Sequence, residues 1–327
     1  MLTGKGGPEM LRPVELPVQE PGSGQVRVAV RATGAGGTDV TMRRGWYMFA
    51  PRIPFVPGYE VLGDVEAVGP GVTEVGVGDR VAALVVHGGY AEKILLPAQV
   101  LVPVRRELDD GEAVALILNY TTAYQAIHRV AKVRAGQTAL VAGASGGVGT
   151  ALLELLHDAG VRVIGSGAPA RHALIRELGA TPIDDRHASI ESGVREIVAE
   201  GVDAAFDGLG GRFSSACVRA TRKGGTVVGY GFSGTHNSKL ATARGMLSVL
   251  LGAPLSGRRG RFYGITAWYR RDPEPFRADL AQLFSLLAAG KLHPKIAARL
   301  PLLAAREANE MLERGGVQGK IVHLATA

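Results

Sequence analysis

The feature that most constrains the fold is a glycine-rich turn between a strand pattern and a helix pattern. Residues 138–142 are apolar and of strand type, and residues 149–159 repeat apolar side chains at helical spacing. The turn between them contains Ala144-Ser145-Gly146-Gly147-Val148-Gly149. A strand, a glycine turn and a helix in this order are typical of a dinucleotide-binding unit, although the glycine pattern alone is a weak signal.

Strands and helices continue to alternate after this turn. A second helix is predicted at 171–178. Neighbouring parallel strands need crossover connections, and helices between the strands supply them. The sequence therefore predicts an α/β fold with a parallel, doubly wound sheet. Its six strands are predicted at 138–142, 161–164, 182–184, 202–206, 226–230 and 261–265.

The chain on either side of this region has a different pattern. Short strand-type runs at 26–31, 63–68, 80–86 and 90–95 predict a β-rich domain. Helices are predicted at 112–131 and 275–289, and a final strand at 320–324 is expected to return to the first domain. We therefore divide the 327 residues into a β-rich domain, 1–118 with 269–327, and a cofactor domain, 119–268.

Composition excludes several classes of protein. The single cysteine, Cys217, rules out an intramolecular disulfide and a Cys-rich zinc lobe, and it fits a reducing cytosol. No signal-peptide core and no run of 18 apolar residues is present, so we expect a cytoplasmic protein with no membrane partner. The formal charge is +7, but the lysines and arginines are dispersed, so we expect no nucleic-acid partner. A basic face that attracts an anionic cofactor explains the charge more simply.

The glycine turn has the residue types that a pyrophosphate site requires. As Ala144-x-Gly146-x-x-Gly149, it is the dinucleotide fingerprint with alanine in the first glycine position. Gly146 lets the backbone approach the pyrophosphate, and Gly149 lets the helix pack on the strand. The anion then lies on the helix N-terminus. The predicted cofactor-binding residues of the turn are Ala144, Ser145, Gly146, Gly147 and Val148.

The end of the second predicted strand favours NADPH over NADH. NAD sites usually place a carboxylate about 20 residues after the glycines to hold the ribose hydroxyls. Residues 163–172 contain no acid. Ser166 and Arg171 suit a 2′-phosphate, because a guanidinium donates paired hydrogen bonds to phosphate. The alternative is that Arg171 is a solvated residue in the first turn of a helix.

Short motifs elsewhere occur in a characteristic order. They are Leu2-Thr3-Gly4-Lys5-Gly6-Gly7-Pro8-Glu9, Pro57-Gly58-Tyr59-Glu60, Val77-Gly78-Asp79-Arg80-Val81, Gly88-Gly89-Tyr90-Ala91-Glu92, Tyr120-Thr121-Thr122-Ala123-Tyr124, Phe206-Asp207-Gly208-Leu209-Gly210-Gly211 and Gly319-Lys320-Ile321-Val322. With the glycine turn, this order resembles the quinone oxidoreductase (zeta-crystallin-like) branch of the medium-chain dehydrogenases/reductases. The resemblance implies a GroES-like catalytic domain, a Rossmann NADP-binding domain and a homodimer joined through the cofactor domains. Relatives carry a few more residues before the first strand.

The zinc ligands of alcohol-dehydrogenase relatives have counterparts that can be located here. The resemblance matches the Cys, His and Cys ligands to Gly36, Tyr59 and Leu118. None of these residues supplies the ligand that the relatives use, so we expect no catalytic zinc. The resemblance therefore points to the zinc-free reductases.

The resemblance also implies further cofactor contacts. Thr122 matches the threonine that orients the nicotinamide, and the alternative is a helix-capping role. The loop at 229–233, with Tyr230, Gly231 and Phe232, resembles the one that holds the carboxamide, and the alternative is a plain strand end. Gly208 belongs to the same implied site, whereas Asp185 stands where relatives often have a tyrosine near the adenine.

For the substrate side, Tyr47 is the candidate proton donor, because it matches a tyrosine beside the substrate in related enoyl reductases. Water is the alternative proton donor. A further alternative is that Trp46 and Tyr47 are ordinary aromatic residues of a pocket or an interface. Trp46, Tyr59 and Leu118 are the predicted pocket residues. Gly36 and Thr41 replace polar residues of the quinone oxidoreductase pattern, which weakens the assignment of a specific quinone.

Four other residues are expected to be structural. Glu60 and Asp79 are expected to satisfy backbone or arginine partners, His87 to lie in a hairpin turn, and Cys217 to be a small buried side chain.

Conjugated acceptors suit an enzyme without a metal, because the charge that hydride addition creates spreads over an enolate or hydroquinone oxygen. We therefore expect an NADPH-dependent reductase of a quinone or an α,β-unsaturated carbonyl. The alternatives are a pathway-specific enoyl or alkenal reductase of secondary metabolism, and a non-catalytic NADPH-binding sensor or interaction protein.

Overall fold

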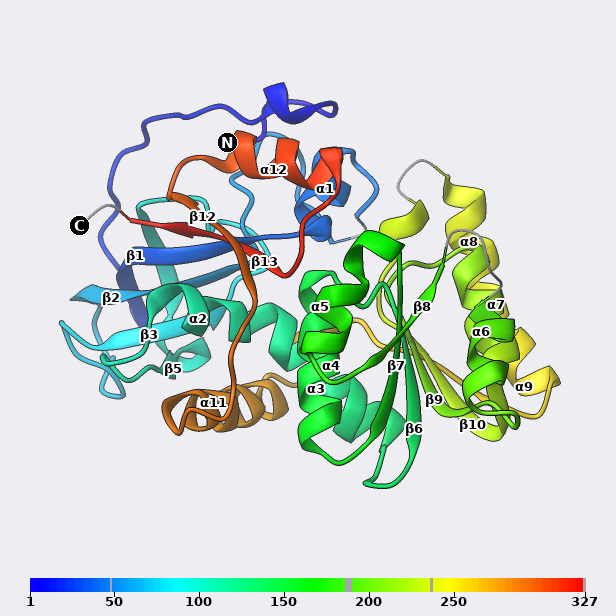
Figure 1. Cartoon of the computed structure of the whole chain (residues 1–327). Helices are drawn as coiled ribbons and strands as arrows, with labels where there is room; N and C mark the ends of the chain where they lie inside the picture. Colours follow the sequence, from blue (N-terminus) through cyan, green and yellow to red (C-terminus); the bar gives the residue numbers. More distant parts are fainter. Residues whose placement is uncertain (48, 186–189, 236–237, 326–327) are drawn as a thin grey trace. The chain divides into compact units, whose positions relative to one another are not determined.

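The computed structural model describes residues 1–47, 49–185, 190–235 and 238–325. The chain divides into two compact units (Figure 1). Unit 1 comprises Met1–Thr121 and Tyr269–Ala327, and unit 2 comprises Thr122–Trp268.

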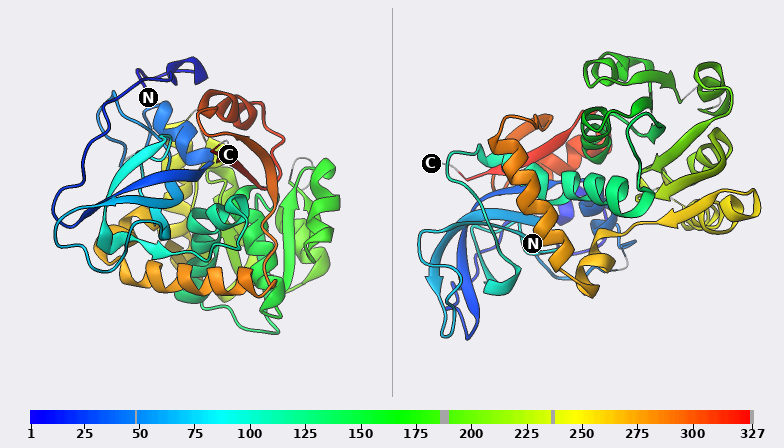
Figure 2. Two further views of the ribbon diagram at one scale, coloured as in Figure 1. Left: turned by 90° about the vertical axis from the view of Figure 1, so that its left-hand side faces the viewer. Right: turned by 90° about the horizontal axis from the view of Figure 1, so that it is seen from below.

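Unit 1 is built on a seven-stranded sheet. Its strands follow the order β12-β13-β1-β2-β3-β5, and β4 pairs with β1 off this path. The last strand pairs antiparallel with the first, as predicted for the returning tail, and both Figures 1 and 2 show red β13 beside blue β1. The strands are β1 (Gln25–Ala35), β2 (Glu60–Val68), β3 (Arg80–Leu84), β4 (Lys93–Pro97), β5 (Val102–Pro103), β12 (Ile296–Pro301) and β13 (Lys320–Leu324).

Unit 1 contains several helical segments, and one of them continues along the chain into unit 2. The predicted helix at 112–131 is one long helical segment that begins at Asp110 and changes between α and π geometry before Lys132 ends it in the left-handed region, with a φ of 55°. The segments of unit 1 are η1 (Pro8–Met10), α1 (Gly37–Arg43), η2 (Ala98–Val100), α2 (Asp110–Ala115), η3 (Leu116–Tyr120), α11 (Glu274–Ala288) and α12 (Ala305–Arg314). Two short helices, α3 (Thr121–Gln125) and α10 (Ile265–Arg271), include residues of both units.

Unit 2 confirms the predicted doubly wound sheet. Six strands pair in parallel in the order β11-β10-β9-β6-β7-β8. The chain starts at β6, proceeds outward through β7 and β8, and then returns to build β9, β10 and β11 on the other side. The strands are β6 (Thr138–Ala142), β7 (Arg162–Gly167), β8 (Thr181–Asp184), β9 (Val202–Asp207), β10 (Thr221–Gly229) and β11 (Arg259–Phe262). The switch between β6 and β9 is where open α/β sheets bind ligands.

The helical segments of unit 2 follow these strands. They are η4 (Ala126–Ala131), α4 (Gly147–Asp158), η5 (Pro169–Arg171), α5 (His172–Glu177), α6 (Ile190–Ile197), α7 (Arg212–Ala220), η6 (Ser233–Thr235), α8 (Lys239–Leu247), η7 (Ser248–Gly252) and α9 (Ala253–Leu255). The apolar strand residues pack against α6, α7 and the α9 segment in one core, which encloses Cys217 completely, as predicted.

Several predicted strands differ from the observed strands at their ends, and two of these differences have a cause that is visible in the hydrogen bonds. The strand predicted at 90–95 begins only at Lys93, because Gly88 and Tyr90 donate their N–H groups to the carbonyls of Val56 and Pro57 instead of to a strand. The strand predicted at 261–265 stops at Phe262, and Ile265 begins α10, where Trp268 donates to the carbonyl of Gly264 in a helical pattern.

Among the described residues, no helix is both long and apolar enough to cross a bilayer.

Candidate active site

The glycine turn of unit 2 has the shape that the sequence predicts. Gly146 caps α4 in an extended conformation, and Gly143 has a φ of +77°, which favours glycine. A Cβ on Gly149 would lie 2.3 Å from the carbonyl oxygen of Gly143, so only glycine lets this helix pack on the turn. A Cβ on Gly146 would meet that oxygen at 3.5 Å, an ordinary contact. The N–H groups of the first turn of α4 lack intrahelical acceptors and favour an anion.

A second pair of loops lies at the same carboxyl edge of the sheet, after β9 and β10. The buried Asp207 carboxylate accepts N–H groups of Leu209 and Gly210, both at 2.9 Å, and the Ser214 hydroxyl at 2.6 Å. Burial raises the pKa of Asp207 despite these bonds. The two loops pack tightly, because a Cβ on Gly231 would lie 2.8 Å from the Gly208 carbonyl oxygen. Predicted residues Gly208, Tyr230, Gly231 and Phe232 therefore share one edge with the glycine turn.

The two residues predicted to recognise a 2′-phosphate differ in exposure. Ser166 is fully buried in β7, and its backbone carbonyl accepts the N–H of Ala144 at 3.1 Å. Arg171 is half-buried in η5, directly after the same strand. Of the two residues, Arg171 is thus the more accessible to a ligand. Thr122 lies in α3 and is buried, and Asp185 follows β8 directly.

In unit 1 the two predicted tyrosines are in contact. The hydroxyl oxygens of Tyr47 and Tyr59 are 2.5 Å apart, and the rings meet edge to face with centroids 6.1 Å apart. Tyr59 is 2% exposed, whereas Tyr47 is half-buried. Burial, then Tyr47 and the nearby carboxylates, raise the pKa of Tyr59 far above its ordinary value.

Phe49 and Arg270 pack in sequence beside the pair of Tyr47 and Tyr59, and together the three rings form an aromatic wall. Phe49 packs edge-on against Tyr47 with ring centroids 5.8 Å apart, and the Arg270 guanidinium carbon lies 5.0 Å from the Phe49 ring centroid. Trp46 is 38% exposed and Leu118 is half-buried, so neither lies deep in the core. Sequence reasoning did not assign Arg270, because a cation over a ring joins residues that are far apart in the chain.

A buried charge cluster lies beside Tyr59. Glu60 is fully buried and forms an ion pair with Lys320, which is 3% exposed. The backbone of Leu118 also hydrogen-bonds to Glu60, so the expected backbone partner is found, whereas the charged partner is a lysine instead of an arginine. Burial raises the pKa of both Asp39 and Glu60, and Lys320 opposes this shift. Gly34 gives the ion pair its space, since a Cβ there would lie 2.0 Å from the Glu60 carboxylate.

The three positions that match zinc ligands gather around this cluster. The N–H of Gly36 donates to the Asp39 carboxylate at 2.9 Å, and the backbone of Leu118 lies near enough to Glu60 to lower its pKa. Tyr59 is the residue before Glu60. Across the described ranges, no group of three or more His, Cys, Asp or Glu side chains could hold a metal. Asp79 accepts a backbone N–H from Gly76 at 2.8 Å, as expected.

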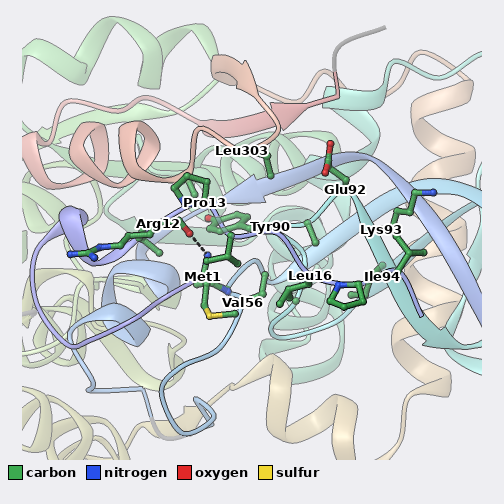
Figure 3. A pocket seen from close by; sticks show the side chains of 18 of the residues that line it. Met1, Arg12, Pro13, Leu16, Val56, Tyr90, Glu92, Lys93, Ile94 and Leu303 are labelled. Carbon is green, nitrogen blue, oxygen red and sulfur yellow. Dashed lines mark hydrogen bonds between the residues drawn. The ribbon is translucent and has the colours of Figure 1, made fainter. Parts of the chain in front are cut away.

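A separate groove of about 870 Å³ lies in unit 1 (Figure 3). Its wall includes the N-terminal segment, where Leu16 is 60% exposed. Met1 and Arg12 also line it, and the Met1 amine donates to the Arg12 carbonyl at 2.7 Å. Tyr90 also lines it. None of the predicted site residues lines this groove, so it is distinct from the candidate site.

Comparison with known proteins places this architecture in a family. The model of the alcohol dehydrogenase GroES-like domain matches residues 22–106, and that of the zinc-binding dehydrogenases matches residues 178–322. Human quinone oxidoreductase is 30% identical over 325 residues, which cover 98% of this chain and 95% of the human protein. The quinone oxidoreductase-like protein 2 homolog of Nematostella vectensis is 31% identical over 306 residues, 92% of this chain and 82% of that protein.

A mycobacterial protein solved in complex with NADPH has the same fold, with a TM-score of 0.87 and 30% identity over 99% of this chain and 98% of that one. The two units and these matches define a nicotinamide-dependent oxidoreductase of the medium-chain dehydrogenase/reductase superfamily. Within it, the chain belongs to the quinone oxidoreductase branch.

Proposed function

We propose that this protein is a zinc-free reductase that uses NADPH to transfer a hydride to a quinone or an α,β-unsaturated carbonyl. The observation that carries the proposal is the edge of the unit 2 sheet, where the glycine turn and the two packed loops after β9 and β10 lie together. This edge meets the requirement for a dinucleotide site at a topological switch point.

The residues of this edge fit a dinucleotide. Gly146 and the first turn of α4 would hold the pyrophosphate, and the loops of Gly208 and Gly231 would hold the nicotinamide end, with Thr122 orienting the ring. Arg171 would bind the 2′-phosphate, with Ser166 contributing if its enclosed hydroxyl is uncovered. When bound, the nicotinamide supplies the hydride.

The residues of unit 1 suit an acceptor that needs no metal. The phenol of Tyr47 can donate a proton to the enolate or hydroquinone oxygen that hydride addition creates. The aromatic wall of Tyr47, Phe49 and Tyr59 matches a planar conjugated acceptor. The positions of Gly36, Tyr59 and Leu118 lack the Cys and His side chains that hold zinc in relatives.

Replacing Gly146 with Ala separates the cofactor site from the fold. Because a Cβ at Gly146 meets its protein neighbour at an ordinary 3.5 Å, we expect the melting temperature to stay within about 2 °C of wild type. We expect NADPH to bind at least about tenfold more weakly, because the new methyl group occupies space for the pyrophosphate. Fluorescence titration with NADPH measures this. The Gly76→Ala variant is the control, because Gly76 lies in unit 1 beside the turn before β3 and a Cβ there would meet only the Asp79 carboxylate, at 4.0 Å. Equal NADPH affinity in wild type and Gly146→Ala would contradict the assignment.

The activity itself is tested by steady-state oxidation of NADPH with a panel of quinones and enones. Turnover with simple quinones and small enones supports the proposal. Activity confined to bulky enoyl or alkenal acceptors would favour a pathway-specific reductase of secondary metabolism. Tight NADPH binding without turnover on any acceptor would favour a sensor or interaction protein.

We also propose that two copies associate through unit 2. Exposed leucines gather on the segment from α8 to α9, where Leu251 is 56% and Leu255 is 89% exposed, and such a patch marks an interface. We expect light scattering to give wild type twice the chain mass of 34.2 kDa, and the Leu251→Glu/Leu255→Glu variant the mass of one chain. Leu303→Glu, at an exposed leucine of unit 1, is the control and should leave the dimer intact. A monomeric wild type would refute this proposal.

A further inference from the structure

Tyr59 stands on the rigid side of the phenol pair. Its backbone carbonyl accepts the N–H groups of both Val85 and Val86 at 2.9 Å. Gly58, just before it, has a φ of +98° and packs so closely on the Gly89–Tyr90 backbone that a Cβ would lie 2.4 Å from the Tyr90 nitrogen. Tyr47 lies in a loop, where its carbonyl accepts only a turn hydrogen bond from Ala50 among the backbone bonds described. The buried strand start therefore fixes Tyr59, and Tyr59 can fix the Tyr47 hydroxyl.

The surroundings also fix which phenol keeps its proton. Tyr59 is 2% exposed and lies next to the buried carboxylates of Glu60 and Asp39, so a negative charge on its oxygen is disfavoured. Tyr47 as a residue is half-buried and so has better access to solvent than Tyr59. In the 2.5 Å contact, Tyr59 is thus suited to donate, and the Tyr47 oxygen to accept.

From this geometry we propose that Tyr59 is a positioning residue for Tyr47. It holds the Tyr47 hydroxyl so that the Tyr47 proton is directed at the substrate, and it stabilises the Tyr47 oxygen when that proton leaves. The idea rests on the proposed reductase function. In it, Tyr59 stands at a sequence position that the resemblance matches to a zinc ligand, and the phenol pair supplies the electrophilic assistance that the metal would give.

The proton step balances without a further reactant. When bound, NADPH would supply the hydride to the conjugated carbon and become NADP⁺, so the substrate would become an enolate. The Tyr47 O–H bond breaks, its proton forms the new bond to the substrate, and the electron pair stays on the Tyr47 oxygen as phenolate. The Tyr59 proton stays on Tyr59 and makes a charge-assisted hydrogen bond to that phenolate, and a solvent proton restores Tyr47 afterwards.

Kinetics of Tyr59→Phe test the idea. A donor to a phenolate lowers the pKa of that phenol, so removing it makes Tyr47 a weaker acid. We expect kcat to fall about 10- to 100-fold and its alkaline limb to move to higher pH. In Tyr47→Phe, kcat should fall at least as far. Adding Tyr59→Phe to Tyr47→Phe should lower kcat no further. Tyr90→Phe removes another buried phenol beside Asp39 and serves as the control, with kcat and its pH profile unchanged.

A second readout needs neither cofactor nor turnover. In protein carrying ring-labelled tyrosine, NMR follows the titration of Tyr47, which the Tyr47→Phe spectrum identifies. We expect Tyr47 to titrate at higher pH in Tyr59→Phe than in wild type, and at lower pH when 3-fluorotyrosine, a stronger donor, replaces Tyr59. The fluorinated protein also serves if Tyr59→Phe does not fold. An unchanged Tyr47 titration would overturn the inference, whereas a wild type without turnover would overturn only the reductase function.

Discussion

Replacing Lys320 with Met is expected to lower the free energy of unfolding by about 3 to 5 kcal/mol. The ammonium group is buried against the Glu60 carboxylate, which is itself completely enclosed. Without Lys320, Glu60 is left as an unpaired buried charge with Asp39 nearby, and burial already raises the pKa of both. Urea denaturation followed by circular dichroism measures the loss.

Two further variants show that the buried pair is the cause. Lys320→Met/Glu60→Gln removes both charges and should recover much of the lost stability. Lys93→Met breaks the 3.0 Å pair with Glu66, in which Lys93 is 44% exposed, and should cost less than about 1 kcal/mol. If Lys320→Met cost no more than Lys93→Met, the account of this cluster would be wrong.

Arg171→Met is expected to weaken NADPH binding about 10- to 100-fold and to leave NADH binding nearly unchanged. A guanidinium that binds the 2′-phosphate contributes charge-assisted hydrogen bonds of about 1.5 to 3 kcal/mol, and NADH lacks that phosphate. Calorimetric titration with both nucleotides measures the difference.

Arg176→Met is the matched control, because Arg176 belongs to α5, the helix that follows Arg171 directly, and is exposed. We expect it to change neither affinity by more than about twofold. Equal weakening of NADPH and NADH by Arg171→Met would show a structural role, and equal affinities of wild type for both nucleotides would refute the preference for NADPH.

The fold of unit 2 could be predicted because its signals are local. The strand at 138–142 is observed as β6 with the same bounds, and Gly149 is a glycine for the packing reason that the fingerprint implies. Helix α7 was not predicted, because its nine residues are of mixed polarity and it is held by packing against β9 and α6. Strand β12 was missed as well, because its partner β13 lies about 20 residues further on and supplies the pairing.

The site could be predicted only in part. Tyr47 and Tyr59 were both selected from motifs, but their 2.5 Å contact depends on how the loop of Tyr47 folds back on the start of β2. Lys320 had one visible signal, a charge at the head of the apolar strand at 320–324, which is unusual unless the charge is paired. Its partner Glu60 is 260 positions away, and no spacing rule joins them. Long-range pairing, not residue type, is what the sequence could not supply.

The central claim is metal-independent hydride transfer from NADPH to a conjugated acceptor. Its most direct test incubates the purified protein with an enone and NADPH deuterated at the transferring carbon of the nicotinamide, with a strong chelator present. We expect one deuterium at the β-carbon of the product by mass spectrometry and NMR, at a rate that the chelator does not change. Product without deuterium, or a rate that requires added zinc, would contradict the account.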